Sequence, residues 1–389
     1  MTTRKTSDKE IEYLKKWLEN NQNSRSESIV LELEEQIRKD YPVERIICTN
    51  SAMGALHLAL QTIGVGPGDE VIVDPIVVFA GMATMYQNAV PKFADIDIET
   101  YNIDPSSILK QITSKTKAII CTHHFGSVCD MKSIMKIAKE HKIPVIEDCA
   151  HALHAKQDGK LAGLFGDFAA FSFNHRKQLS TGQGGFLLIN SKEYAEKSKD
   201  KGFGRVPARL TWNYAMPGII AGLAIAQWEL AREYVKKDHE LAKLYTEALQ
   251  DCEWIKPQKV PNENWSAYHI WAATFTGDDK GIKYNEFMEV LKNNGGDYFL
   301  PSFMPYGAFD LDPSPAYRYP IFSDPNINWI KSDLYGKIYD GKINYSKGIC
   351  PNAEYIVPRM LNTVLSPIED KLIEKYATGL MKTIKHFSN

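Results

Sequence analysis

One lysine and one aspartate stand out because their surroundings in the sequence could let them do chemistry. Lys177 lies in F-S-F-N-H-R-K-Q-L-S-T-G-Q-G-G, after an apolar run and before a glycine-rich turn, and Asp148 ends the apolar run P-V-I-E-D. Taken alone, each has a plainer interpretation, as a solvated lysine and a helix-capping aspartate. A lysine shielded from water, however, can attack an aldehyde and form an imine, and an acid can keep a ring nitrogen protonated. Together they predict a pyridoxal phosphate (PLP) site with Lys177 as its catalytic residue.

The phosphate of PLP needs hydrogen-bond donors, and two segments could provide them. Ser51, Ala52 and Met53 come at the start of a predicted helix, whose first N–H groups and dipole attract an anion. Ser172 lies shortly before Lys177 and could add a hydroxyl to the same site. Ser51 could equally be a plain helix N-cap, so this segment is a weak signal by itself.

Two further residues could contact the ring of the cofactor. His151 follows Asp148 closely, and Phe79 follows the apolar run V-D-P-I-V-V, where an aromatic side chain can stack on a flat ring or simply belong to the core. Glu147 should point to the opposite side of its strand from Asp148 and serve structure. His154 completes H-A-L-H, but this pair of histidines is a weak metal signal, so we expect packing or cofactor contact and no metal site.

The bulk properties exclude several classes of protein. The net charge of -2 offers no large basic field for a nucleic acid, and no apolar run is long enough to cross a membrane. The first ten residues lack the apolar core of a signal peptide. The six cysteines are scattered, which is typical of free thiols in a reducing cytoplasm. We therefore expect a cytoplasmic protein.

Apolar strands alternate with helices over the first half of the chain. This pattern predicts an α/β fold with a mostly parallel sheet and helices on both faces. Ligands bind at the carboxyl ends of the strands in such sheets, and Ser51–Met53, Asp148–His151 and Ser172–Lys177 all follow strand ends. We therefore expect these three segments to converge. The strands are expected at 45–48, 70–73, 91–94, 117–122, 144–147, 168–173 and 185–189.

The length of 389 residues exceeds what one core usually supports, so we expect two domains. Residues 1–245 should form a large domain that begins with a helical segment over 8–40. Residues 246–389 should form a smaller α+β domain. A long helical stretch over 218–249 is apolar on more than one face, which suits a helix that joins two domains or lies in a subunit interface.

Over most of its length the chain resembles the DegT/DnrJ-type sugar aminotransferases, which are fold type I PLP-dependent enzymes. The resemblance implies that fold, with a mostly parallel seven-stranded sheet in the large domain and a smaller α+β C-terminal domain. The whole set of motifs is far more specific than any one of them. The matching segments are S-A-M-G-A-L-H-L-A-L, V-G-P-G-D-E-V-I-V-D-P, D-I-D-I-E-T-Y-N-I-D-P, V-I-E-D-C-A-H-A-L, F-G-D-F-A-A-F-S-F, N-Y-A-M-P and C-P-N-A-E.

The resemblance also implies a role for each candidate residue. Lys177 becomes the imine-forming lysine and Asp148 the partner of the ring nitrogen. Phe79 takes the stacking position, with His151 beside the ring. Asn213 is implied to reach the phosphate in the neighbouring subunit, which means a homodimer with shared active sites. The phosphate positions fall to Ser51, Ser172 and the backbone at Ala52 and Met53.

The implied activity is transfer of an amino group from glutamate or glutamine to a keto-sugar, nucleotide-linked, or to a ketocyclitol. Three motifs depart from the family pattern: S-G-T becomes S-A-M at Ser51–Met53, G-E-G-G becomes G-Q-G-G at Gln183, and N-Y-R-M becomes N-Y-A-M at Ala215. These changes bear on the donor and the substrate. Aromatic side chains that could pack on the substrate, or serve folding, are Tyr298, Phe299, Phe303, Tyr306 and Tyr317.

Two other functions are compatible with this fold. Related sugar dehydratases replace the lysine with histidine; His175 lies nearby, but Lys177 fills the lysine position. A regulatory protein that keeps the fold without turnover is the second alternative, favoured by the altered phosphate turn.

Overall fold

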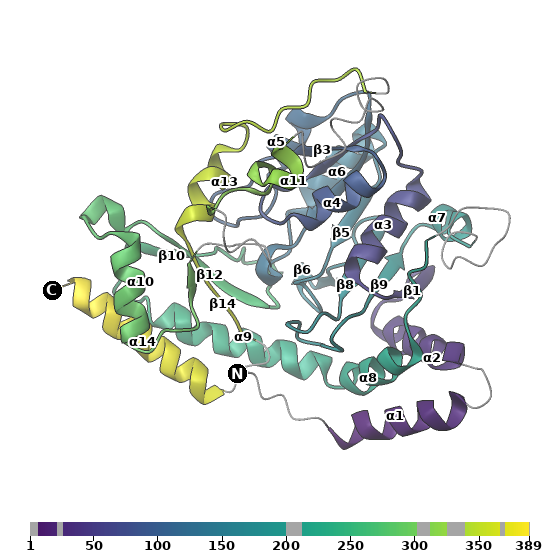
Figure 1. Cartoon of the computed structure of the whole chain (residues 1–389), viewed down its shortest axis with the longest axis horizontal. Helices are drawn as coiled ribbons and strands as arrows, with labels where there is room; N and C mark the ends of the chain where they lie inside the picture. The colour runs from purple at the N-terminus through teal and green to yellow at the C-terminus, as the bar shows by residue number, and fades with distance from the viewer. Residues whose placement is uncertain are drawn as a thin grey trace.

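The computed structural model describes residues 7–21, 26–199, 212–301, 312–324, 339–365 and 370–388. A seven-stranded sheet forms the centre of the larger part of the molecule (Figure 1). Strand β9 runs antiparallel to both of its neighbours, and the remaining pairs are parallel. The predicted fold class is therefore confirmed. In spatial order the strands are β1 (Arg45–Thr49), β9 (Gly185–Ile189), β8 (Phe168–Ser172), β5 (Val145–Asp148), β4 (Thr116–Thr122), β2 (Glu70–Val73) and β3 (Val90–Phe93).

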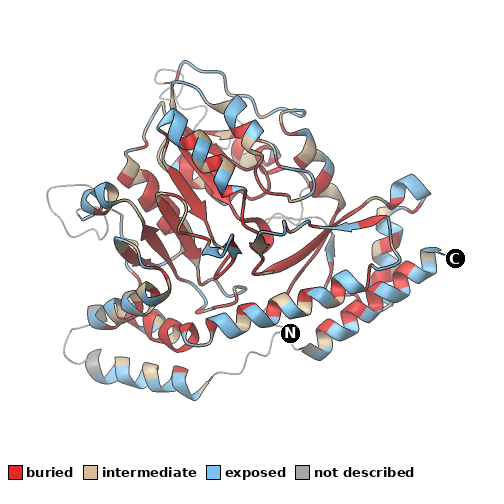
Figure 2. Ribbon diagram, turned by 180° about the vertical axis from the view of Figure 1, so that it is seen from behind, coloured by how far each residue is buried: buried red, intermediate tan, exposed pale blue. Residues whose placement is uncertain are grey.

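Helices cover both faces of this sheet because its strands are apolar on both sides. Alternate residues of a strand enter different cores: Ile146 packs with the helices of one face, whereas Val145 packs with those of the other. Figure 2 shows the strands buried along their length. One face carries α3 (Ala52–Ile63) and α4 (Phe79–Tyr86), and the other carries α2 (Ser26–Asp40), α5 (Pro105–Gln111), α6 (Met131–His141) and α8 (Gly218–Trp228).

The two long helical stretches are each divided. The N-terminal stretch contains α1 (Asp8–Asn21) and α2, both packed on α8. The second stretch breaks at Glu229 and Leu230, between α8 and α9 (Ala231–Glu247). The break falls where the pattern changes: α8 is apolar and buried nearly all round, whereas α9 buries one stripe. Helix α9 then runs from the large sheet to the small one (Figure 1).

A second, antiparallel sheet forms the core of the smaller part, with α9 and two further helices packed against it (Figure 1). Its strands are β10 (Ile255–Pro257), β12 (Ile270–Phe275), β14 (Met360–Val364) and β13 (Leu300–Pro301), and its helices are α10 (Tyr284–Asn293) and α14 (Asp370–Ser388). A third, minor sheet joins the two parts of the molecule, because β11 (Asn264–Trp265) pairs with β6 (Lys156–Gln157). Strand β6 also pairs with β7 (Lys160–Leu161).

The chain returns from the small sheet to the large one after residue 312. Tyr317, Phe322 and Cys350 join the core on the α3 side of the large sheet, and the Tyr345 hydroxyl donates to the Pro91 carbonyl at 2.9 Å. The expected division at residue 245 stays a prediction, and this return segment packs with the first part of the chain. Its short helices are α11 (Pro320–Ser323) and α13 (Pro351–Ile356).

Two expectations about chemistry outside the site can be compared with the structure. All six cysteines are free, and five are buried. Across the described ranges no helix combines the length and the apolar character needed to span a bilayer.

Candidate active site

The three predicted segments meet at the carboxyl edge of the sheet. Asp148 ends β5 and pairs with Thr122 of β4 on one side and with Ala170 of β8 on the other. Ser172 ends β8, and the loop that follows carries Lys177. The parallel arrangement therefore brings the lysine, the aspartate and the serine to one edge of the sheet, as expected from the strand ends.

Hydrogen bonds hold the loop that carries Lys177 on both sides of the lysine, one within the loop and one to the segment before β12. The Phe173 amide donates to the Gly184 carbonyl at 2.9 Å, and the Gln178 side chain donates to the Ala267 carbonyl at 2.7 Å. Burial lowers the pKa of the Lys177 amine to about 7, although the charge of Asp148 opposes the shift. A large share of the amine is therefore neutral and nucleophilic near neutral pH.

Asp148 is buried, and burial raises the pKa of its carboxyl group. The Ala150 amide, which donates to Asp148 Oδ1 at 3.0 Å, and the charge of Lys177 oppose this shift. The base and the acid are therefore electrostatically coupled, and each reduces the cost of burying the other.

His269 is a site residue that the sequence analysis missed. Its Nε2 lies 3.4 Å from Lys177 Nζ, and it directly precedes β12 of the small sheet. Burial and the charge of Lys177 hold the pKa of His269 well below its usual value. A histidine before an apolar strand of the other sheet carries no sequence signal for a contact this distant along the chain.

His151 lies on the same side of the site. Its ring stacks on Phe125, with centroids 6.1 Å apart and planes at 16°, and lies 4.9 Å from the ring of His269. Burial, with the charge of Lys177 next, holds the pKa of His151 well below its usual value. The Nδ1 atoms of His151 and His269 are buried without a hydrogen-bond partner among the described residues.

The residues predicted to bind the phosphate lie around Gly185, where the first three strands in spatial order, β1, β9 and β8, are paired. Gly185 pairs with Thr49 of β1 and with Ser172 of β8. A Cβ at Gly185 would lie 2.7 Å from the Ala52 nitrogen, so the start of α3 is packed directly on this glycine. Ser51 caps α3 by accepting the Gly54 amide at 3.0 Å.

The first N–H groups of a helix have no carbonyl partner within it. In α3 the cap leaves those of Ala52 and Met53 pointing out of the helix end, where an anion is favoured. Ser51, Ala52 and Ser172 thus surround one glycine, and the Met53 side chain packs against the core of the large sheet.

Phe79 and Asn213 lie at the surface. Phe79 is the first residue of α4, and 48% of its side chain is exposed, which is unusual for a core phenylalanine. Asn213 is exposed next to Asn50, and its carbonyl accepts the Asn50 side chain at 3.4 Å. The Asn50 amide donates to the Tyr214 carbonyl at 2.9 Å and fixes this segment at the start of α3. The assigned roles of both residues stay predictions.

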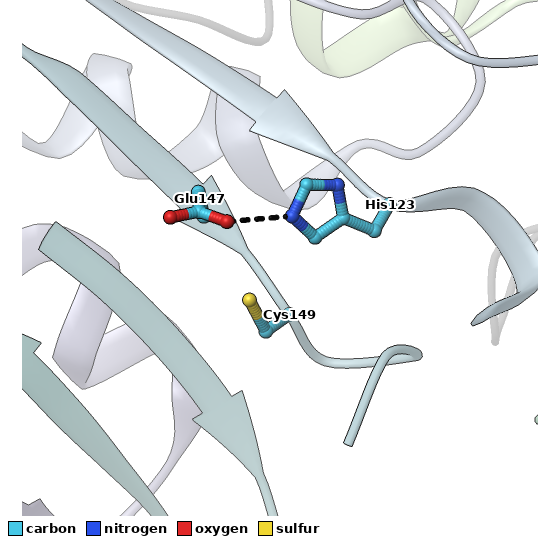
Figure 3. Close-up of side chains that lie close together, drawn as sticks. All are labelled: His123, Glu147 and Cys149. Atoms are coloured by element: carbon cyan, nitrogen blue, oxygen red, sulfur yellow. Dashed lines mark hydrogen bonds and ion pairs between the residues drawn. The ribbon is translucent and has the colours of Figure 1, made fainter. Parts of the chain in front are cut away.

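His123, Glu147 and Cys149 lie close together, and a hydrogen bond joins His123 to Glu147 (Figure 3). The Cys129 amide donates to His123 Nδ1 at 3.1 Å, so in the neutral ring Nε2 carries the hydrogen and donates to Glu147 at 3.0 Å. Glu147 also accepts the amides of residues 163, 165 and 166, each at 2.7 Å. No lone pair of the histidine is left for a metal, and Glu147 has the structural role expected of it.

A second buried pair lies beside Asp148. His124 Nε2 is 2.8 Å from Asp74 Oδ1, and the Thr122 hydroxyl donates to Asp74 Oδ2 at 2.6 Å. Burial raises the pKa of Asp74, but His124 and these hydrogen bonds outweigh it and hold the pKa below its usual value. The negative charge of Asp74 therefore contributes to the raised pKa of Asp148.

The proposed substrate-side aromatics serve the core where the structure describes them. Tyr298 stacks on Tyr376 at 5.7 Å, Phe299 is buried in the core of the small sheet, and the Tyr317 hydroxyl donates to Glu354. Phe303 and Tyr306 lie outside the described residues. Gln183 and Ala215 are exposed.

These residues fit PLP by their own chemistry. A desolvated amine and a buried carboxyl group are coupled across the site, two imidazoles offer unpaired nitrogens, and a glycine that admits no Cβ lies at the end of a helix with free N–H groups. The amine suits an aldehyde, the carboxyl group suits a ring nitrogen, and the helix N–H groups suit a phosphate.

Comparison with known proteins gives the same result. A sequence model of the DegT/DnrJ/EryC1/StrS aminotransferase family matches residues 4–309. The chain belongs to this family. The family members use PLP and are aminotransferases, so the predicted cofactor and enzyme class are confirmed.

Individual proteins match most of the chain. The GDP-perosamine synthase of Escherichia coli O157:H7 is 32% identical over 333 residues, which is 82% of this chain and 88% of that protein. The X-ray structure of an aminotransferase from Psychrobacter cryohalolentis superposes with a TM-score of 0.81 at 22% identity and covers 100% of both chains. The PLP form of a Streptococcus pneumoniae protein described as a sugar aminotransferase has a TM-score of 0.80 at 19% identity, covering 99% and 98%. The last two matches show the fold.

Proposed function

We propose that this aminotransferase moves an amino group from glutamate or glutamine to a keto-sugar carried on a nucleotide, with a ketocyclitol as the related alternative. The observation that carries the proposal is the coupling of Lys177 with Asp148 at the edge of a family-matched sheet. The sugar is supported by the GDP-perosamine synthase, because its name specifies a GDP-linked product.

The residues divide the chemistry among them. PLP bound here supplies an aldehyde that takes up the amino group and a ring that withdraws electrons from the substrate carbon. Lys177 offers a neutral amine, and once released it moves a proton at the substrate carbon, a role that typically contributes ~10²–10⁴-fold. Asp148 supplies the negative charge that holds a proton on the ring nitrogen. Phe79 and His151 are assigned to the ring, and Ser51, Ala52, Met53 and Ser172 to the phosphate.

We also propose a cytoplasmic homodimer in which Asn213 reaches the partner's phosphate site. Asn213 is exposed, although its Oδ1 accepts the Ala215 amide of its own chain at 3.3 Å. Phe79, Tyr86 and Trp212 are each more than two-fifths exposed, and a second copy could cover such apolar side chains. The free, mostly buried thiols are consistent with a reducing compartment.

The function can be tested with the PLP-loaded chain, L-glutamate or L-glutamine, and a panel of nucleotide-linked keto-sugars that includes GDP-linked ones. We expect an aminated sugar in mass spectrometry. The matched control is the same nucleotide sugar with its carbonyl reduced to an alcohol, which should give no product. Loss of water from the sugar without gain of nitrogen would establish the dehydratase, and no conversion of any keto-sugar or ketocyclitol with either donor would contradict the proposal.

A further inference from the structure

The Lys177 amine touches a side chain that the small sheet supplies. His269 Nε2 lies 3.4 Å from Nζ, across 92 positions of sequence. Within the described ranges, the structure records no other hydrogen-bond partner for Nζ. The site built by the large sheet therefore contains a group whose position depends on the smaller part of the molecule.

The backbone on either side of this contact is tied together directly. Gln178, next to the lysine, donates from its side chain to the carbonyl of Ala267 at 2.7 Å. Because Ala267 precedes His269 by only two positions, the loop that carries the amine and the segment that carries the imidazole cannot move apart without losing this buried hydrogen bond.

The segment before His269 is also held in an unfavourable conformation. Tyr268 has φ +46°, a left-handed value that residues with a Cβ rarely adopt. Gly126 packs against it so closely that a Cβ there would lie 2.5 Å from the Tyr268 nitrogen, and the Ala267 amide donates to the Gly126 carbonyl at 3.0 Å. Conformations of this kind persist where the surroundings fix them, often at functional sites.

Protonation determines the direction of the hydrogen bond. An ammonium group has donors only, so when Lys177 is charged, Nε2 of His269 must accept and the imidazole must be neutral. The groups that face this cluster are Asp148, His151, His124 and the guanidinium of Arg176. Burial and, next, the charge of Lys177 hold the pKa of both His269 and His151 well below its usual value, which leaves the amine as the group that carries the proton.

A packing role is the alternative for His269, since its ring also contacts that of His151 at 4.9 Å. Packing alone does not require a nitrogen at the ring position nearest Nζ. The geometry places Nε2 there and leaves Nδ1 without a partner among the described residues.

We propose that His269 is a positioning residue for Lys177. Its Nε2 accepts a hydrogen bond from the amine whenever the amine is free, and so keeps Nζ at the place from which it transfers a proton. This role deepens the proposed aminotransferase function and rests on it.

Two amide variants of nearly equal polarity test the proposal. In His269→Gln the amide reaches the position of Nε2, whereas in His269→Asn it reaches only that of Nδ1. Competitive acetylation of the full-length chain freed of PLP, followed by mass spectrometry over a pH series, gives the pKa of Lys177, with exposed Lys243 as internal reference. We expect Asn to lower this pKa by about one unit, a tenfold change in the neutral fraction, because the ammonium loses its acceptor; Gln should retain the wild-type value.

A second measurement uses the PLP-loaded enzyme with L-glutamate and with L-glutamine, each with and without deuterium at the α-carbon. Misplacing the amine should lower the single-turnover rate at least about tenfold in the Asn variant and enlarge the kinetic isotope effect. In the Gln variant the rate and the isotope effect should both be close to those of the wild type. Equal Lys177 pKa values in the two variants, whether shifted or unshifted, would overturn the proposal. The labelling needs neither donor nor acceptor, so a failure of the aminotransferase function appears separately, as absent turnover with the labelling difference intact.

Discussion

At the scale of single residues, the site contains a base and an acid whose pKa values burial moves toward each other. The amine of Lys177 becomes easier to deprotonate and the carboxyl group of Asp148 harder to ionise. Each also stabilises the charged form of the other, so removal of either leaves a buried charge without compensation, which is costly. The pair can therefore bind a ligand that brings both an aldehyde and a ring nitrogen, with the amine facing the aldehyde and the carboxyl group facing the nitrogen.

Replacing Lys177 with alanine removes the amine that we propose binds PLP covalently. We expect the visible absorbance of the lysine-bound cofactor to disappear and the turnover rate to fall by ~10²–10⁴-fold or more. Absorption spectra of the PLP-loaded chain measure the first effect. Lys192→Ala, which changes an exposed lysine on α7 (Lys192–Lys197), is the control and should leave the spectrum unchanged; an unchanged spectrum in Lys177→Ala would refute the lysine assignment.

The lowered pKa of Lys177 predicts how attachment of PLP depends on pH. Only the neutral amine attacks an aldehyde, so the attachment rate should rise about tenfold per pH unit below pH 7 and level off above it. Stopped-flow absorbance after PLP is mixed with the cofactor-free chain measures this rate. A rate that keeps rising through pH 9 would show that the amine has an ordinary pKa.

At the scale of secondary structure, the phosphate end depends on how closely α3 approaches the sheet. Gly185 is the point of contact: a side chain there would meet the Phe171 carbonyl at 2.4 Å and the Ala52 nitrogen at 2.7 Å, both of them backbone atoms that cannot turn away. The β8–β9 pair and the helix start are thus held at a separation that only glycine allows.

Gly185→Ala should push the start of α3 away from Ser172. We expect weaker PLP binding, by tenfold or more, and a loss of about 1–3 kcal/mol in the free energy of unfolding from overpacking. Fluorescence titration with PLP and urea denaturation measure the two effects. Gly66→Ala is the matched control, because nothing lies within 4 Å of a Cβ there; similar behaviour of both variants would contradict the account of this contact.

The sequence predicted the elements of the large sheet well because their signal is local. Each strand of that sheet is an apolar run bounded by turn residues, and all seven were located within one residue at their boundaries. The break at Glu229 and Leu230 was not predicted, because both sides of it read as helix and only the width of the apolar face changes there. The two-residue strands of the minor sheet were not predicted, because they are too short to show a periodic pattern. His269 was missed for a different reason: its role comes from the docking of two sheets, which no short stretch of sequence encodes.

At the scale of the whole molecule, the proposed shared site predicts complementation between subunits. A dimer that combines one Lys177→Ala chain with one Asn213→Ala chain has one site with both residues intact and one with neither. Random mixing of the two chains should therefore restore about a quarter of wild-type activity, although each variant alone is impaired. Activity after unfolding and refolding the mixed chains tests this, and sedimentation confirms the dimer; no recovery from a mixture that does form dimers would show that Asn213 serves its own chain.

The return of the chain to the large sheet after residue 312 also limits how the protein can be divided. Tyr317, Phe322 and Cys350 cover apolar side chains next to Phe93 of β3, a strand at the end of the sheet. A fragment ending near residue 245 would expose that apolar surface and lack His269, so it should aggregate on expression instead of yielding a working half-enzyme. Gene fragments cut near residue 245 are thus poor starting points for chimeras, and swaps that carry the C-terminal third together with the sheet it covers are the sounder choice.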